Sequence, residues 1–584
     1  MGDEDWTTKE VDDWVARGML TREHVLSRLD HGIKTSHAIH PDEEPFLEAA
    51  FASASTSAPS GDNQVLTEPA FISLLKTGAA LPQGPEGIEA GRIIYESISY
   101  LSTVPFPPNA PQPFSQTGAL SLAQLTRGLV WTLPDRSKYI VEESNLSRMR
   151  TRFDRQRLLF QSLATSTVPA AAQGGVRDRA RLLAGRHAFD VSWEGWLDIC
   201  AVNHDDDGDE IYHDLLDVLY STQEARPRWS TRVRRDAFRA VAKQIKAEER
   251  LPELHTLAIP TRRFKALVKV LLVRQMELTY DDIGRNVDVS QYDDAADSIC
   301  AAFAQGQDMG TAELITWPSF SHALETAAPH ILEPIYRLLS ETFLNQATPT
   351  GVPEAPDAPR SLPEDAILTL PRISQLVSFL AESAYVGYLR RMARYISPVF
   401  PTPVALVQAM VSAPEYAIVL FSGRIIAASA EQGKPCVFGL FSPAPKKDGG
   451  CIQAPSEIDP DNAGQRPCEL FQLTPVQDVF RGVVGEAGWS VVADAEGGES
   501  IVFGGAGAID SDEDRKGGVA LVLRDGLRRG QIQHWGGAMD VDSGGGEDGG
   551  KKKGVVYEAN RSRGDWTLEF VVEEIEIWSE VPEC

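Results

Sequence analysis

The spacing of apolar residues changes near residue 400, and this change constrains the fold more than any other feature of the sequence. Before that point apolar residues recur every three or four positions, as in Phe264, Leu267 and Val268, which places them on one face of a helix. After it they form short runs of strand length, separated by turn residues. We therefore expect an α+β fold, with a helical N-terminal region followed by a β-rich region.

The helical pattern recurs along the first two thirds of the chain. A capping box is predicted at Ser121 and Gln124, where a hydroxyl and an amide can each satisfy a backbone N–H group of the first turn. A last helical pattern runs from about 366 to 396. The other segments that we expect to be helical are 66–77, 146–164, 231–247 and 317–345.

The short apolar runs of the last third predict strands. No helical pattern long enough for a parallel crossover separates them, so we expect an antiparallel β-sandwich. In the last run the apolar residues change from even to odd positions, which predicts a β-bulge at Glu573 and Glu574. The predicted strands are 416–421, 436–441, 469–473, 489–493, 500–503, 519–523 and 571–578.

Proline-rich and glycine-rich segments suggest the domain boundaries. A proline-rich stretch between 347 and 359 lacks apolar residues to bury and is typical of an interdomain linker. Another, at 105–113, separates two helical regions. The predicted organisation is an N-terminal helical region at 1–104, a second helical region at 114–346, a linker at 347–363, and a C-terminal domain at 364–584 with a flexible insertion at 540–554.

Charge and composition exclude several classes of protein. A net charge of −27 argues against direct nucleic-acid binding, because affinity for phosphates comes largely from Lys and Arg. Six dispersed cysteines without a Cys-x-x-Cys pair predict reduced thiols and no zinc site. The N-terminus is acidic and has no secretory signal. The apolar window 404–428 is interrupted by Pro414, Glu415 and Arg424, so we expect no transmembrane segment and a cytoplasmic protein.

An acidic run imitates the first half of a calcium-binding loop. Asn203, Asp205 and Asp207 would supply oxygen ligands, and Gly208 would form the turn. The apolar residue that should follow comes one place late, and Asp214 stands where a bidentate glutamate is usual. A solvated acidic loop is the default interpretation, and calcium binding is left open. No metal ion and no cofactor is predicted.

Catalytic patterns in the C-terminal region are incomplete. The segment 503–507 lacks the full glycine fingerprint of a nucleotide-binding loop, and its glycines are better explained by a bend in a sheet. His534 is the only histidine after residue 330, so a catalytic triad or dyad confined to this region would depend on it. We expect His534 to be a surface or strand-end residue.

Four glutamates near the end of the chain admit two interpretations. Paired carboxylates can act as acid and base where their environments separate the pKa values. A solvent-facing strand edge protected by charge explains them equally well, and exposed carboxylates could also contact a basic partner. These residues are Glu569, Glu573, Glu574 and Glu576.

Gly2 is a candidate site for N-myristoylation. The usual acceptor pattern has Ser or Thr where Trp6 stands, with Thr7 one place later. A single acyl chain would bind a membrane only weakly, and the acidic neighbourhood would add no attraction to anionic lipid.

Three segments of the last third resemble a TLDc domain: Phe503 with the glycines that follow it, the run 518–524, and 566–578. The whole chain resembles the fungal family called restriction of telomere capping protein 5, through the order of several phrases along the sequence. Those phrases are 69–75, 95–101, 129–134, 157–163, 315–320 and 367–375.

The resemblance implies a helical region that is remotely EF-hand-like, followed by a TLDc antiparallel sandwich flanked by helices. It also implies a noncatalytic cytoplasmic adaptor, peripheral at the vacuolar membrane, whose protein partner is the vacuolar proton-pumping ATPase, with only an indirect, genetic link to telomeres. The residues expected to shape the domain, through core packing and tight turns more than through direct contact, are Phe503, Gly504, Gly505, Asp525, Gly530, Phe570, Ile577 and Trp578.

A competing hypothesis is an oxidative-stress protection protein, since TLDc relatives have been linked to oxidation resistance. Its redox groups would be Cys436, Cys451 and Cys468. A reactive cysteine needs a pKa lowered by a cation or a helix N-terminus, and only Lys434 and Arg466 lie near these cysteines in sequence.

Overall fold

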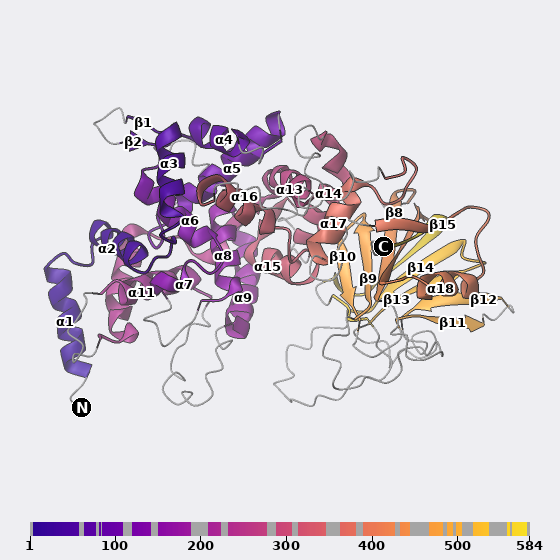
Figure 1. Ribbon diagram of the computed structural model, residues 1–584. Helices are drawn as coiled ribbons and strands as arrows, with labels where there is room; N and C mark the ends of the chain where they lie inside the picture. Colours follow the sequence, from indigo (N-terminus) through magenta and orange to yellow (C-terminus); the bar gives the residue numbers. More distant parts are fainter. Residues whose placement is uncertain are drawn as a thin grey trace, which may run out of the picture.

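The protein has a helical half and a half built around one large antiparallel sheet (Figure 1). The predicted α+β class is therefore confirmed. The computed structural model describes residues 4–57, 64–77, 81–82, 84–108, 119–141, 150–187, 208–223, 232–276, 288–305, 313–345, 362–380, 389–426, 432–443, 467–482, 488–493, 498–504, 518–536, 557–560 and 563–580. The predicted linker and the predicted insertion at 540–554 lie almost wholly outside these ranges.

The helices of the helical half surround one hydrophobic core that contains residues from both predicted helical regions. The capping box is present at the start of α6, where Gln124 N donates to Ser121 Oγ at 3.3 Å. The helices are α1 (Glu4–Ala16), α2 (Arg22–Thr35), α3 (Glu44–Ala54), α4 (Glu68–Thr77), α5 (Pro85–Leu101), α6 (Leu122–Thr132), α7 (Lys138–Val141), α8 (Arg152–Leu163), α9 (Ala170–His187), α11 (Glu210–Ser221), α12 (Arg239–Glu249), α13 (Thr261–Met276), α14 (Asp293–Phe303), α15 (Trp317–Thr326), α16 (Glu333–Phe343), α17 (Leu370–Leu380) and α18 (Pro403–Val411).

Short strands also occur inside the helical half, where none was predicted. They are β1 (Thr56–Ser57), β2 (Gln64–Val65), β3 (Ser166–Thr167), β4 (Leu257–Pro260) and β5 (Leu314–Thr316), of which the first two pair with each other and the last three form a small sheet. Segments of two to four residues carry too little alternation to be recognised in a sequence.

The large sheet has the strand order β10-β9-β8-β7-β15-β14-β13-β12-β11 and does not close into a barrel. Every pairing in it is antiparallel, as predicted. Its strands are β6 (Leu389–Ile396), β7 (Tyr416–Ile425), β8 (Pro435–Pro443), β9 (Glu469–Thr474), β10 (Asp478–Arg481), β11 (Ser490–Ala493), β12 (Glu499–Phe503), β13 (Val519–Arg524), β14 (Arg529–His534) and β15 (Trp566–Glu580). The predicted strands are all present, whereas β6, β10 and β14 were not predicted.

The sheet folds over so that strands distant in its order face each other. The rings of Phe421 in β7 and Phe503 in β12 have centroids 5.5 Å apart, although three strands lie between them. Phe480 in β10 lies 5.6 Å from the imidazole of His534 in β14. The two layers thus enclose a second hydrophobic core, against which α18 packs.

The long strand β15 joins the two layers. Its first part pairs with β14, its last part pairs with β6 on the same edge, and β7 pairs along the opposite edge. The register against β7 shifts between Val572 and Glu574, which confirms the predicted bulge and leaves Glu573 as the extra residue. Phe570, Val572, Ile575 and Ile577 consequently all face the enclosed core.

One predicted helix is partly wrong. The pattern from 366 to 396 forms a helix only at Leu370–Leu380, and its end, Leu389–Ile396, is the strand β6. The segment 389–396 carries apolar residues and arginines at spacings compatible with either structure. The segment 389–396 forms a strand because it pairs with β15 over seven register positions, and such tertiary contacts override a weak local preference.

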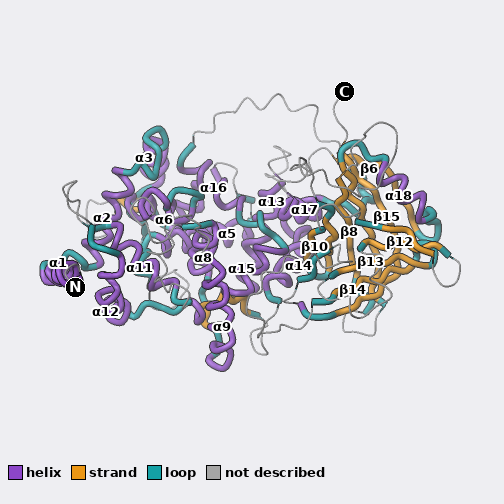
Figure 2. Tube along the Cα trace, turned by 90° about the horizontal axis from the view of Figure 1, so that it is seen from below, coloured by secondary structure: helices purple, strands orange, loops and turns teal. Residues whose placement is uncertain are grey.

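Helix α17 connects the two halves. Its apolar side packs on the outer surface of β7, β8 and β9, where the rings of Phe379 and Phe471 have centroids 5.3 Å apart. The helices α14 and α15 contact β9 and β10, so the edge of the sheet lies against the helical half (Figure 2).

Candidate functional site

The residues singled out by the TLDc resemblance lie in cores and turns. Phe503, Phe570 and Ile577 belong to the enclosed core of the sheet, and Trp578 belongs to the core beneath α17. Their side chains are buried, so they shape the sheet and offer no contact to a partner.

The glycines and the aspartate in this group have steric roles. A Cβ atom on Gly530 would lie 2.2 Å from Cζ of Phe570, which leaves room only for glycine. Gly504 has a φ of 138° and Asp525 has a φ of 53° in the turn between β13 and β14. Gly505 lies outside the described residues, as does Gly2.

The part of the sheet that no described helix covers is a candidate contact surface. Val571 of β15 points away from the enclosed core, opposite Arg424 of β7, and Ile426 is its diagonal neighbour on the same face. Beyond the bulge, Ile396 at the end of β6 pairs with Glu574 and also bridges to Val399. We call Val571, Ile426, Ile396 and Val399 the outer apolar patch.

The side chains of the outer apolar patch are strongly exposed for their type. Val399 is 75% exposed, Ile396 51% and Val571 39%. Single exposed apolar residues are ordinary, whereas several on one sheet face are typical of a contact surface. The sequence signal for Ile396 was obscured because the segment ending at 396 was predicted to be helical.

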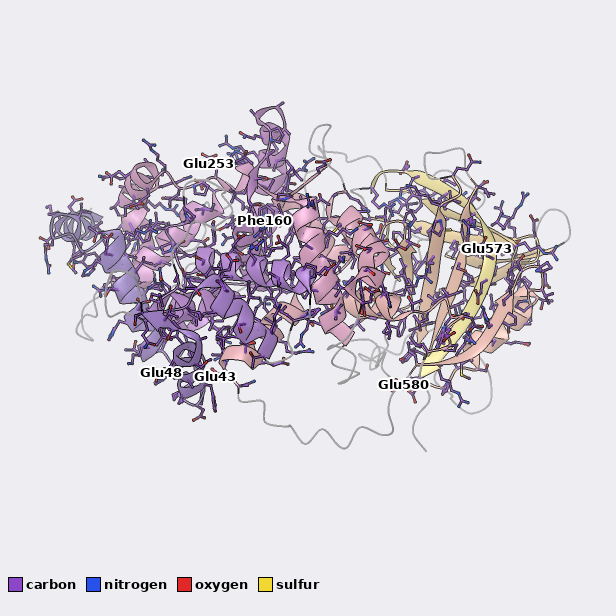
Figure 3. All side chains as sticks on the ribbon, turned by 90° about the horizontal axis from the view of Figure 1, so that it is seen from above. Glu43, Glu48, Phe160, Glu253, Glu573 and Glu580 are labelled. Carbon is purple, nitrogen blue, oxygen red and sulfur yellow. The ribbon has the colours of Figure 1, made fainter. Side chains whose placement is uncertain are left out.

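Polar groups hold the backbone around the patch. Ser397 N donates to Glu573 O at 2.9 Å, and Arg528 donates to the carbonyl of Pro398 at 3.3 Å. Arg424 and Glu573 form an exposed ion pair at 3.0 Å across the neighbouring strands. Figure 3 shows Glu573 on the long strand of the sheet half. The patch is therefore rimmed by both signs of charge, which suits a protein surface better than a lipid surface.

The four glutamates near the end of the chain do not form one surface. Glu569 and Glu573 are exposed, but Glu576 is fully buried, where it accepts from Arg391 at 2.9 Å and from Trp578 Nε1 at 2.9 Å. Glu574 is paired with Arg394. The interpretation as a charged strand edge, one of the two left open, is thus wrong, because β15 is a central strand and Glu574 and Glu576 bind arginines of β6.

The junction between the two halves is polar and closely bonded. Gln477, fully buried, donates to Ala327 O and to Ser378 Oγ, both at 2.9 Å, and accepts from Gln375 at 3.1 Å. His322 of α15 lies 2.6 Å from Asn560 Oδ1. These bonds fix the orientation of the sheet on the helical half.

Glu469 at the start of β9 is a buried carboxylic acid of this junction whose pKa is raised. Burial raises its pKa to about 7, although Arg481 and His330 act in the opposite direction. Arg481 is its cross-strand partner, and His330 is bound to Glu333 at 2.6 Å. The protonation of Glu469 therefore changes near neutral pH.

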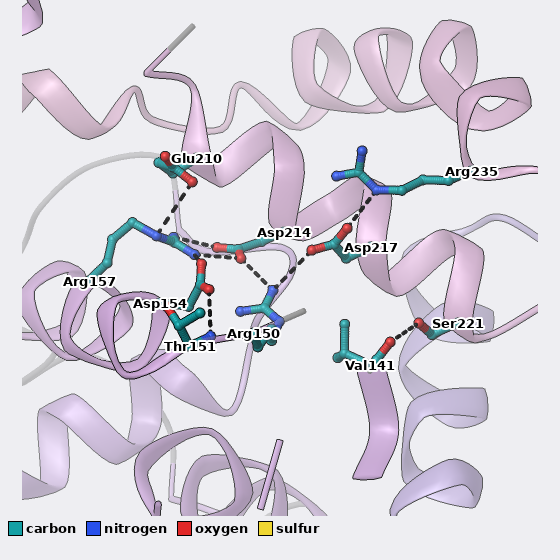
Figure 4. Close-up of polar contacts among 10 residues, drawn as sticks. All are labelled: Val141, Arg150, Thr151, Asp154, Arg157, Glu210, Asp214, Asp217, Ser221 and Arg235. Atoms are coloured by element: carbon teal, nitrogen blue, oxygen red, sulfur yellow. Dashed lines mark hydrogen bonds and ion pairs between the residues drawn. The ribbon is translucent and has the colours of Figure 1, made fainter. Parts of the chain in front are cut away.

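Asp214, at the end of the segment that resembles a calcium-binding loop, has a different role. Asp214 of α11 accepts from Arg150 at 2.5 Å and from two guanidinium nitrogens of Arg157, each at 2.7 Å (Figure 4). The same buried network includes Asp154, Glu210, Asp217 and Arg235. Burial lowers the pKa of Arg157, but the carboxylates, Asp214 foremost, raise it overall.

This network opposes a calcium-ligand role for Asp214, since two arginines already neutralise its carboxylate. Asn203, Asp205 and Asp207 lie outside the described residues. Within the described ranges, no three His, Cys, Asp or Glu side chains are placed to hold a metal ion together.

His534 agrees with one of the two positions predicted for it. It is the last residue of β14, but it is buried, stacked on Trp566 at 5.3 Å, and its Nδ1 lies 2.8 Å from Gly564 O. Burial lowers the pKa of this imidazole. It was predicted to lie at the surface or a strand end, and only the strand end is correct.

The two described cysteines of the redox hypothesis, Cys436 and Cys468, are not activated by their surroundings. Burial raises the pKa of Cys436 to about 12 and also raises the pKa of Cys468, so both thiols stay protonated at neutral pH. Cys451 lies outside the described residues, as does Arg466.

No protein-family model matches the chain, and no curated protein matches it at a significant level. Membership of the TLDc family therefore stays a prediction from the residues. Of the helices that are described, none combines the length and the apolar character needed to cross a bilayer.

Proposed function

We propose that the protein is a noncatalytic adaptor that binds another protein through the outer apolar patch. The single observation that carries this proposal is the exposure of Val571, Ile396 and Val399 at neighbouring positions on the outer side of the sheet. By contrast, Glu576 is engaged in an ion pair with Arg391, the thiol of Cys436 is buried and that of Cys468 is half-buried.

The partner that the sequence resemblance favours is the vacuolar proton-pumping ATPase. In this proposal the protein works at the cytoplasmic face of the vacuolar membrane, and its link to telomere capping is indirect. The TLDc fold and the EF-hand-like character of the helical half belong to the same proposal. The rigid junction through Gln477 supports it, because the helical half can then set the orientation of the sheet on a large partner.

The test is capture of vacuolar membrane proteins by the full chain, followed by mass spectrometry. The variant Val399→Asp combined with Val571→Asp places two charges on the patch and should reduce the captured partner by about tenfold or more, as expected for residues central to an interface. Leu182→Asp is the matched control, since Leu182 is 70% exposed on α9 in the helical half.

Enrichment of ATPase subunits that the patch variant abolishes and Leu182→Asp preserves would support the proposal. If the unaltered chain captures no ATPase subunit, the partner is wrong. If capture occurs but the patch variant, folded as judged by circular dichroism, binds as well as the control, the surface is wrong.

A further inference from the structure

A cavity of about 370 Å³ opens between α11 and α12 in the helical half. Its wall includes the buried side chain of Tyr212, whose hydroxyl donates to Arg239 O at 3.3 Å. Three cationic side chains line it, Lys243, Lys246 and Arg250, against one carboxylate, Asp209. This volume is at the lower end of the range of small-molecule sites.

Two of the three cations have no neutralising partner among the residues that the structure describes. Lys246 is paired with Asp209, but neither Lys243 nor Arg250 forms an ion pair with any described residue. The chain as a whole has a net charge of −27, whereas the lining of this cavity carries three cations and one carboxylate. Unpaired cations around a hollow attract an anion that can approach several of them at once.

Stabilisation of the helix end explains only part of this arrangement. Lys246 and Arg250 lie at the C-terminal end of α12, where cations interact favourably with the helix dipole. Lys243 lies a turn earlier, where that effect has faded. On the opposite wall α11 begins, and its N-cap residue Asp209 makes no side-chain cap bond.

The backbone at Arg250 adds an independent indication. Arg250 caps α12 in the left-handed conformation, with φ 51° and ψ 47°. Glycine adopts this conformation at less cost and is the usual residue at such a helix end. The charged side chain of Arg250 occupies this position at the rim of the cavity.

We infer that the cavity between α11 and α12 binds an anionic ligand that carries phosphate groups, with Lys243, Lys246 and Arg250 as its contacts. Lysine supplies point charges and arginine a planar fork, and both are suited to phosphate oxygens. A phosphorylated polyol could be free or could be the headgroup of a lipid. The inference is independent of the adaptor proposal, because the cavity lies in the helical half and the outer apolar patch in the sheet.

The experiment titrates the full chain with inositol hexakisphosphate in a calorimeter at about 0.15 M salt, where exposed charges are largely screened. A second arm uses vesicles of neutral lipid with and without phosphatidylinositol phosphates. Saturable binding of the free molecule indicates a soluble ligand, whereas binding confined to phosphoinositide vesicles indicates a lipid headgroup. Absence of binding in both arms would overturn the inference.

The variants are Arg250→Gly and Lys243→Ala. Glycine is favoured by the backbone at position 250, so Arg250→Gly removes the charge without straining the fold. Each variant should weaken binding by about tenfold, the loss expected for one charge-assisted hydrogen bond. Lys434→Ala, which removes an exposed cation from the sheet half, should leave the dissociation constant unchanged.

An equal loss of affinity in all three variants would show nonspecific attraction to positive charge and would overturn the inference. Unchanged affinity in Arg250→Gly and Lys243→Ala would do the same. Thermal unfolding of each variant, compared with the unaltered chain, ensures that a loss of affinity reflects the missing charge.

Discussion

At the scale of single residues, burial gives ordinary side chains unusual properties. Glu469 is a carboxylic acid whose pKa is raised to about 7 by burial, so it keeps its proton in the folded state at pH values where the unfolded chain has lost it. Such a group contributes its full share of the unfolding free energy below the pKa of the unfolded chain. This contribution is lost as the pH rises through the pKa of the folded state.

We predict that Glu469→Gln reduces the pH dependence of stability. Between pH 5 and pH 8 the unaltered chain should lose about 3 kcal/mol of unfolding free energy through this group, since one pKa unit corresponds to about 1.4 kcal/mol. Glutamine does not titrate, so the variant should lose correspondingly less. Denaturant unfolding of both proteins at the two pH values measures the difference, and equal losses would refute the role of Glu469.

Gly530 is a second residue whose surroundings decide its effect. A methyl group there would meet the ring of Phe570 at 2.2 Å, so we predict that Gly530→Ala lowers the unfolding free energy by about 1–3 kcal/mol. Gly32→Ala is the matched control, because Gly32 lies in α2 with nothing within 4 Å of the added atom. It should stabilise the protein by about 0.5–1 kcal/mol. Thermal or denaturant unfolding of the two variants should give opposite signs.

At the scale of elements, α17 depends on a buried charge of the sheet. Glu576 of β15 accepts bonds from Arg391 and Trp578, and Leu368 N donates to it at 3.3 Å just before α17 begins. Loss of the carboxylate would leave these donors without their acceptor in a buried site.

We predict that Glu576→Ala destabilises the protein by about 2–4 kcal/mol and loosens α17. Glu573→Ala on the same strand removes an exposed carboxylate paired only with Arg424, and it should change stability by less than about 0.5 kcal/mol. Hydrogen exchange of 370–380, together with unfolding in denaturant, distinguishes the two. Similar effects of both variants would show that the burial of Glu576 does not matter.

The helices and strands also show which parts of the fold could be predicted from the sequence. Runs with clear alternation, and the phase change at Glu573, predicted the strands and the bulge because side-chain direction on a strand follows a period of two. The strand β6 was missed because 389–396 contains arginines that bind Asp365 and Glu574, contacts distant in sequence. The same error hid Ile396 in the outer apolar patch. The cavity could not be predicted, since Lys243 and Asp209 meet only through packing of α12 on α11.

At the scale of the whole molecule, the hydrogen bonds of the junction connect the helical half to the sheet half. Gln477 bonds to Ala327 in the helical half and to Ser378 and Gln375 of α17. The hydrogen-bonding groups of these three residues lie in the junction, so each loses its partner if the side-chain amide of Gln477 is removed.

We predict that Gln477→Ala lowers the unfolding free energy by about 2–3 kcal/mol and raises hydrogen exchange in β10 and α17 before it does so elsewhere. Gln244→Ala is the control, because Gln244 is exposed on α12 and bonds only Glu248 there. Exchange that rises equally throughout the described helices and strands would contradict a local opening of the junction.

The place of β15 in the strand order has a consequence for synthesis of the chain. The ribosome makes β7 and β14 well before the strand that must lie between them. The helical half, all of whose core residues precede residue 345, can assemble while translation continues. The sheet cannot be completed in the same way, so its apolar strands stay without their central neighbour until β15 emerges.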